Sequence, residues 1–163
     1  MMNRRLFIKS TATVGAALSL APNLLGADAP KPAEVKLPPI VSPNKMSVEE
    51  NIKVLTGGKA VKSGKITLTA PDIAENGAVV PVKVEVDHPM DDKNYVKAIH
   101  VINEKNQNSR CASVLLTPAN GKGYFSTRVK LGESQKVIAL AELSDGSFYR
   151  AEKEVKVTIG GCG

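Results

Sequence analysis

Strict alternation of apolar and polar residues is the feature of this sequence that most restricts its fold. In "AVVPVKVEVD" (residues 78–87), valines occupy every second position and alternate with Pro81, Lys83 and Glu85. A period of two predicts a β-strand with one face in a core. Turn-forming clusters such as "HPMDDKN", "PANGKG" and "SDGS" separate this run from six similar ones. Those six runs are residues 65–70, 95–103, 111–117, 124–131, 136–143 and 148–159.

Seven such runs without a second helical pattern predict an all-β fold, an immunoglobulin-like antiparallel β-sandwich of about seven strands. The chain has no tryptophan, so it lacks the core pattern of an antibody-type domain. One short helix precedes the strands: Ser47 and Glu50 have the spacing of a capping box, and Gly57 follows the expected helix, Val48–Thr56. Pro81 cannot donate to a strand ladder, so its strand is expected at an edge or with a bulge.

The first 27 residues have the pattern of an export signal. Three basic residues, Arg4, Arg5 and Lys9, precede an apolar stretch that is shorter than a membrane-spanning helix, and small residues follow it. The paired arginines resemble the twin-arginine motif, which predicts export to the periplasm; an ordinary secretory signal is the alternative. We expect cleavage after Ala27; Ala29 also fits, but the proline after it would hinder a peptidase. No cysteine lies near the cleavage region, so no lipid anchor is expected.

The charge of the remaining chain limits its possible functions, and its composition divides it into three segments. Removing the three basic residues of the signal lowers the formal net charge from +6 to +3, too little and too scattered for a nucleic-acid-binding surface. We expect a proline-rich extended segment over residues 28–45, a sandwich domain with its short leading helix over 46–159, and a terminal arm over 160–163.

The sequence shows no catalytic constellation and no cofactor motif. There are two histidines, His88 in a turn and His100 within a strand, and we expect both to be structural. Paired-cysteine zinc motifs and phosphate-binding glycine loops are absent. A copper or redox module using His88, Met90 and Cys162 remains an alternative, although the sequence after Cys162 offers no further ligand.

The chain ends "VKVTIGGCG", with Cys162 between glycines directly after the last strand. Gly160, Gly161 and Gly163 remove neighbouring side chains and add backbone freedom, which predicts a thin, flexible arm that presents a thiol. The alternatives are an incidental cysteine on a structural adhesion or assembly subunit, and a disulfide with Cys111. We expect Cys111, in a strand, to face the core as a small apolar residue.

This ending resembles the C-terminus of the SoxY family, the sulfur-carrier subunits of the periplasmic thiosulfate-oxidising Sox system. The resemblance extends over "LTGGK" (55–59), "GKITLTAPDIAENGAVVPV" (64–82), "STRVKL" (126–131) and "AELSDGSFY" (141–149). The family usually has two glycines after the cysteine, whereas this sequence has Gly163 alone, so the arm is one residue shorter or the sequence is clipped.

The resemblance implies a carrier without an active site of its own. Cys162 would hold thiosulfate-derived sulfur, and Gly160, Gly161 and Gly163 would form the arm. The implied partners are a SoxZ-like β-sandwich subunit in a heterodimer, a SoxAX-like haem enzyme that couples thiosulfate to the thiol, a SoxB-like hydrolase that releases sulfate, and a SoxCD-like sulfur dehydrogenase.

Overall fold

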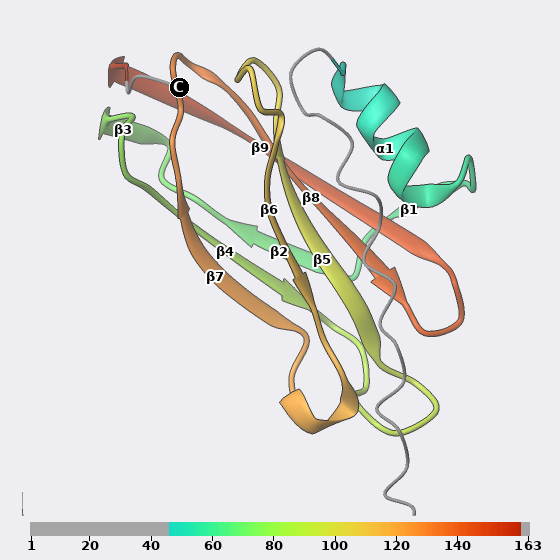
Figure 1. Cartoon of the computed structure of the whole chain (residues 1–163). Coiled ribbons are helices and arrows are strands. Elements are labelled where there is room, and N and C mark those ends of the chain that lie inside the picture. Colours follow the sequence, from blue (N-terminus) through green and yellow to red (C-terminus); the bar gives the residue numbers. More distant parts are fainter. Residues whose placement is uncertain (1–45, 161–163) are drawn as a thin grey trace, which may run out of the picture. The chain divides into compact units, whose positions relative to one another are not determined.

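A computed structural model describes residues 46–160 of the chain. The expected export signal, the segment 28–45, and Gly161, Cys162 and Gly163 lie outside these residues. The described part holds one α-helix, α1 (Val48–Thr56), a 3-10 turn at Pro118–Asn120, and nine strands (Figure 1). The strands are β1 (Val61–Ser63), β2 (Ile66–Thr69), β3 (Ile73–Asn76), β4 (Val80–Val86), β5 (Val96–Asn103), β6 (Arg110–Leu115), β7 (Tyr124–Val129), β8 (Gln135–Leu143) and β9 (Phe148–Ile159).

The strands form two sheets, which confirms the predicted all-β sandwich. The larger sheet has the order β1-β9-β8-β5-β6, with β3 also paired to β9, and the smaller sheet has the order β2-β4-β7. All seven predicted strands are present. Two more, β1 and β3, are only three and four residues long, and both pair with β9 in parallel, so the large sheet is mixed rather than purely antiparallel.

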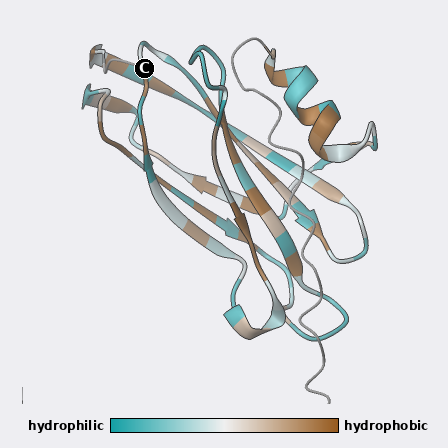
Figure 2. Cartoon of the chain, viewed as in Figure 1, coloured by the Kyte–Doolittle hydropathy of each residue, from teal (hydrophilic) through white to brown (hydrophobic). Residues whose placement is uncertain are grey.

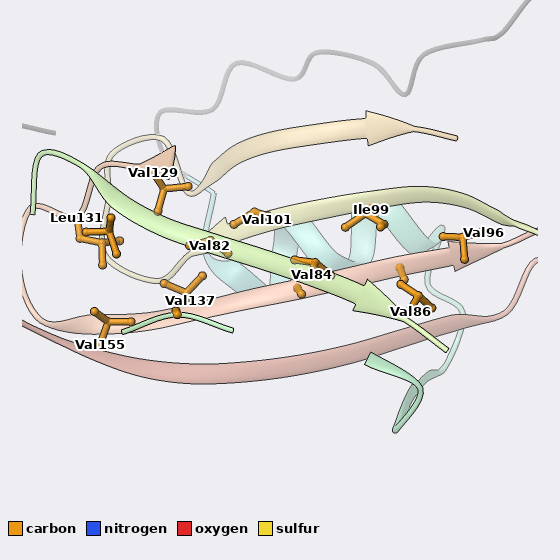
Figure 3. Packing of buried hydrophobic residues seen from close by; sticks show 14 of the residues in the cluster. Val82, Val84, Val86, Val96, Ile99, Val101, Val129, Leu131, Val137 and Val155 are labelled. Carbon is orange, nitrogen blue, oxygen red and sulfur yellow. The ribbon is translucent and has the colours of Figure 1, made fainter. Parts of the chain in front are cut away.

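Valine side chains from the small sheet fill the space between the sheets. Along β4 the residues alternate between buried and exposed, and Val80, Val82 and Val84 are 0 % exposed. Val82 and Val84 point toward residues of β5 and β8 such as Ile99, Val101 and Val137 (Figure 3). The period of two in the sequence therefore places one row of side chains in the core and the other in solvent.

Helix α1 covers the outer face of the large sheet. Val48 and Ile52 pack against Ile102 and Ile138, which lie opposite each other on β5 and β8. Both faces of β5 are therefore buried over most of its length, and its apolar character is visible in Figure 2. Among the described residues, no helix is both long and apolar enough to span a membrane.

The helix begins and ends as the sequence predicts. Glu50 N donates to Ser47 Oγ at 3.3 Å, and Ser47 N donates to Glu50 Oε2 at 2.7 Å, which completes the capping box. At the other end Gly57 adopts φ +62°, the left-handed conformation that glycine accepts without strain.

The expectation that Pro81 marks an edge strand or a bulge is wrong, because β4 lies between β2 and β7 in regular register. Val86 N bonds Gly123 O beside β7, whereas Asp87 N bonds Lys65 O beside β2. Amides alternate between the edges of a strand, so the nitrogen of Pro81 faces the β2 side. On that side β2 ends at Thr69, which lies opposite Lys83. Pro81 therefore has no β2 residue opposite it, and its missing N–H costs no ladder hydrogen bond.

Candidate functional site

The last strand carries the chain toward Cys162. β9 is 12 residues long, and it pairs with β8 over residues 148–155 and with β3 over residues 156–159. Its final residues therefore extend beyond β8, and Figure 1 shows that β9 and β3 end side by side at one end of the sandwich. Ile159 is 69 % exposed there.

The end of β9 is held by loops on both sides. Gly77 N donates to Ile159 O at 2.8 Å, and Leu131 N donates to Gly77 O at 2.7 Å. On the opposite edge Val157 N donates to Ser134 Oγ at 2.9 Å. The backbone is thus fixed up to the residue before the terminal glycines.

Gly160 is the last described residue, and it lies against the backbone of Gly132. A Cβ atom at Gly160 would collide with the carbonyl oxygen of Gly132. Gly161, Cys162 and Gly163, which the sequence also assigns to the arm, lie outside the described residues, so their roles remain predictions.

Cys111 lies on β6 at a break in register with β5. Ala112 pairs with Val101 and Arg110 pairs with Ile102, so Cys111 is the extra residue of a β-bulge. It packs against the main core, and its Sγ lies 3.4 Å from the carbonyl oxygens of both Asn108 and Ser109. Among the described residues it is a free thiol. The expected orientation toward the core is therefore observed.

Burial makes Cys111 a poor nucleophile. Desolvation raises the pKa of its thiol to about 11, and this effect outweighs a backbone hydrogen bond from Asn103, which lowers the pKa. At neutral pH almost none of it is thiolate, the reactive form. A hollow of about 260 Å³ adjoins this thiol at the open edge between β6 and β7, where Asn108, Arg128 and Lys130 also line it.

His100 is a structural residue of β5. It is 2 % exposed, and its Nδ1 lies 2.8 Å from Ser113 Oγ on β6. Burial, aided by the charge of Arg110, lowers its pKa to about 4, so the imidazole is neutral at physiological pH.

His88 and Met90 lie far from the end of β9. Both follow the C-terminal end of β4, whereas Gly77, which bonds Ile159, precedes its N-terminal end. Val80 and Val86 are six residues apart along β4, so the two ends of this strand are separated by roughly 20 Å. Cys162 can lie at most about 7 Å from Gly160, since it is only two residues further along the chain. Met90 Sδ already accepts a hydrogen bond from Val96 N at 3.3 Å.

This separation argues against a copper site formed by His88, Met90 and Cys162 within one chain. The described residues contain no group of three or more His, Cys, Asp or Glu side chains that could hold a metal ion. Two buried side-chain atoms, His88 Nδ1 and Asn103 Oδ1, have no hydrogen-bond partner within that same part of the chain.

Fold and site together define a class: a small β-sandwich whose last strand, fixed in place up to Gly160, leads to a C-terminal cysteine. The model of the family described as "Sulfur oxidation protein SoxY" matches residues 52–162, a span that ends on Cys162. The chain therefore belongs to the SoxY family.

Solved structures agree. The sulfur carrier protein SoxY from Chlorobium limicola f thiosulfatophilum is 30% identical, with a TM-score of 0.59, covering 69% of this chain and 97% of that one. A superoxide reductase (neelaredoxin) from Ignicoccus hospitalis is 16% identical, with a TM-score of 0.54, covering 60% of this chain and 94% of that one. A putative superoxide reductase from Thermotoga maritima is 18% identical, with a TM-score of 0.52, covering 60% of this chain and 93% of that one. These two reductases share the fold alone. No curated protein matches the chain.

The sequence predicts Cys162 and the terminal glycines as site residues, but it does not indicate Gly132. Nothing around "KLGES" indicates that this glycine faces the chain terminus, because the approach joins segments that are 28 residues apart in sequence. A glycine directly after a predicted strand reads as an ordinary turn residue.

Proposed function

We propose that this chain is a periplasmic sulfur carrier that binds thiosulfate-derived sulfur covalently on Cys162. The observation that carries the proposal is the family match, which extends through the sandwich to Cys162 itself. The SoxY protein of Chlorobium limicola is titled a sulfur carrier protein, and its match covers 97% of that chain.

The two cysteines of the chain support the choice of Cys162. Cys111 is half-buried at a bulge, and its raised thiol pKa leaves it almost fully protonated. Cys162 follows Gly160 and Gly161 beyond the last strand, and these two residues have no side chains that would obstruct a partner enzyme.

Loading is a two-electron oxidation. The Cys162 thiol and thiosulfate form a new S–S bond, giving Cys–S–S–SO3⁻, one proton and two electrons; a SoxAX-like haem enzyme takes the electrons. Water then attacks the sulfonate sulfur in a SoxB-like hydrolase, and the S–S bond to it breaks to release sulfate and leave a persulfide on Cys162. A SoxCD-like dehydrogenase then takes six electrons from that sulfane sulfur, while three water molecules supply oxygen and six protons leave, which gives Cys–S–SO3⁻.

In this proposal the chain supplies the thiol and its placement, and the partner enzymes supply catalysis. A SoxZ-like subunit completes a heterodimer with it. Export by the twin-arginine pathway delivers the folded carrier to the compartment in which these enzymes act.

Intact-mass spectrometry tests the proposal. Carrier isolated from the periplasmic fraction of thiosulfate-grown cells should show a species heavier by one S2O3 group, localised to Cys162 by peptide mapping. Cys111→Ala should retain the adduct, and Cys162→Ser should lose it while keeping its circular dichroism spectrum. An unmodified Cys162 during thiosulfate turnover would overturn the carrier role, and absence from the periplasmic fraction would overturn the location.

A further inference from the structure

Gly160 is the one glycine of the predicted arm that the structure describes. Gly160 packs against the carbonyl of Gly132, and a Cβ atom placed on it would lie only 3.4 Å from the Gly132 carbonyl carbon and closer still to the oxygen. Real Cβ atoms do not approach backbone oxygen so closely. The φ of Gly160 is outside the left-handed region, so close approach, and not an unusual conformation, is what requires glycine here.

Three segments meet at this point. Gly77 joins the end of β9 to the loop after β7, because its amide bonds Ile159 O at 2.8 Å and its carbonyl accepts from Leu131 N at 2.7 Å. We call this junction the arm root; it comprises Gly77, Leu131, Gly132, Ser134, Ile159 and Gly160.

Both edges of β9 contribute to the arm root. Thr158 Oγ1 donates to Glu75 O at 2.9 Å on the β3 side, and Val157 N donates to Ser134 Oγ at 2.9 Å on the β8 side. Residues 157–160 are therefore held between β3 with the loop that follows it on one side and the loop from β7 to β8 on the other.

We propose that Gly160 is a fixed positioning residue that sets the direction in which Cys162 leaves the domain, so that the arm predicted from the sequence begins no earlier than Gly161. This inference rests on the proposed carrier function, and it revises the expectation that Gly160 belongs to the flexible part. A methyl group at Gly160 has to displace either the end of β9 or the 131–134 loop, since the obstructing atom is backbone.

The fixed point shortens the tether. If Ile159 were the last fixed residue, Cys162 could lie up to about 10 Å from it, whereas Cys162 lies within about 7 Å of a fixed Gly160. A short tether confines the thiol to a small volume and raises its effective concentration at a correctly docked active site. The direction in which the chain leaves the arm root therefore affects how well every partner enzyme can receive the thiol.

Distance measurements on the free carrier test the root itself. In a Cys111→Ala background, one spin label is placed on Cys162 and a second on Ser126→Cys, an exposed position of β7. Gly160→Ala should shift or broaden the distance distribution between the labels. Gly161→Ala, which adds the same methyl group one residue beyond the contact, should leave the mean distance unchanged. Circular dichroism confirms that both variants are folded.

Kinetics on the unlabelled variants give a second readout. For Gly160→Ala, kcat/KM of the thiosulfate-coupling haem enzyme should fall about tenfold, because small displacements of reacting groups are costly. Reaction of Cys162 with a small disulfide reagent should keep its wild-type rate, since that reagent approaches from any direction.

The outcomes separate the two proposals. A wild-type distance distribution in Gly160→Ala, or equal effects of Gly160→Ala and Gly161→Ala, would overturn the fixed root. Failure of every variant, wild type included, to gain a thiosulfate adduct would overturn the carrier function, and the spin-label distances would still decide the root.

Discussion

The two cysteines show how strongly position controls the chemistry of a single residue type. Cys111 is inserted at a bulge and half-buried, and burial raises its thiol pKa to about 11. Its Sγ also contacts two backbone carbonyl oxygens. The sequence shows where the cysteines stand, but the burial of Cys111 at the bulge is what keeps its thiol protonated.

His100 is the other residue whose chemistry the fold changes. Its ring lies on the helix-covered face of β5, as does Ile102 two residues later, and its hydrogen bond to Ser113 replaces water. Its pKa is lowered to about 4, first by burial and then by the charge of Arg110. The imidazole is therefore neutral in the folded protein and protonated below about pH 6.5 in the unfolded chain.

We predict that stability falls as the pH drops from about 6.5 to 4 because of His100. Its pKa in the folded state is the lower one, so the unfolded state takes up the proton first and is favoured. The contribution is fully present well above pH 6.5, and roughly 2–3 kcal/mol of it is lost by pH 4.5.

Urea unfolding of the wild type and of His100→Gln at pH 7 and pH 4.5 measures this contribution. The decrease in the free energy of unfolding should be smaller in the variant by about that amount, since the carboxylates titrate in both proteins. Equal decreases would show that His100 is not the responsible group.

At the scale of elements, close packing requires a glycine at the start of β7, as it does at the end of β9. Gly123 precedes β7 and its carbonyl accepts from Val86 N at 2.8 Å. A Cβ atom there would lie 2.6 Å from Val96 Cγ2 and 3.3 Å from Val86 Cβ. Both valines are core residues, so the extra methyl group has no space.

We predict that Gly123→Ala lowers the free energy of unfolding by about 1–3 kcal/mol, the usual cost of overpacking. Val96→Ala removes the obstructing methyl group, so Gly123→Ala should cost less in that background, as urea unfolding of the double-mutant cycle would show. Gly121→Ala is the control: Gly121 has φ +67° with no atom within 4 Å, so its cost should not depend on Val96. Additive costs for Gly123 and Val96 would contradict the prediction.

Elements with strong local signals could be predicted from the sequence. Helix α1 begins and ends where its capping box and Gly57 place it, and the strands other than β1 and β3 follow the seven predicted runs. The short strands β1 (VKS) and β3 (IAEN) could not be predicted, because neither has apolar residues at alternate positions, as β2 (ITLT) has. They are strands through their pairing with β9, a partner more than 80 residues away.

At the scale of the whole molecule, β9 connects the framework to the proposed carrier residue. It pairs with β8, β1 and β3 and spans the large sheet from Phe148 to Ile159. Its inward residue Val155 is 0 % exposed in the main core. A strand held in this way gives the chain terminus a rigid base.

We predict that deletion of residues 161–163 separates stability from function. The free energy of unfolding should change by less than about 0.5 kcal/mol, because the core residues and the bonds of the arm root lie in residues before them. Formation of the thiosulfate adduct should be abolished.

Chemical denaturation and intact-mass spectrometry of the same preparation check both parts. A loss of stability above about 1 kcal/mol would show that the deleted residues pack on the domain. A retained adduct would place the carrier thiol elsewhere, with Cys111 as the remaining candidate.

The sequence by itself determined the sandwich, the helix and the terminal cysteine, because alternation, capping and glycine flanks are local patterns. Tertiary structure alone decided that Pro81 sits in a central strand, that Cys111 forms a bulge, and that Gly160 meets Gly132. These features arise where segments distant in the chain come within atomic contact, and no local pattern records which segments will meet. The terminal glycines look alike in sequence, and the neighbouring backbone is what distinguishes Gly160.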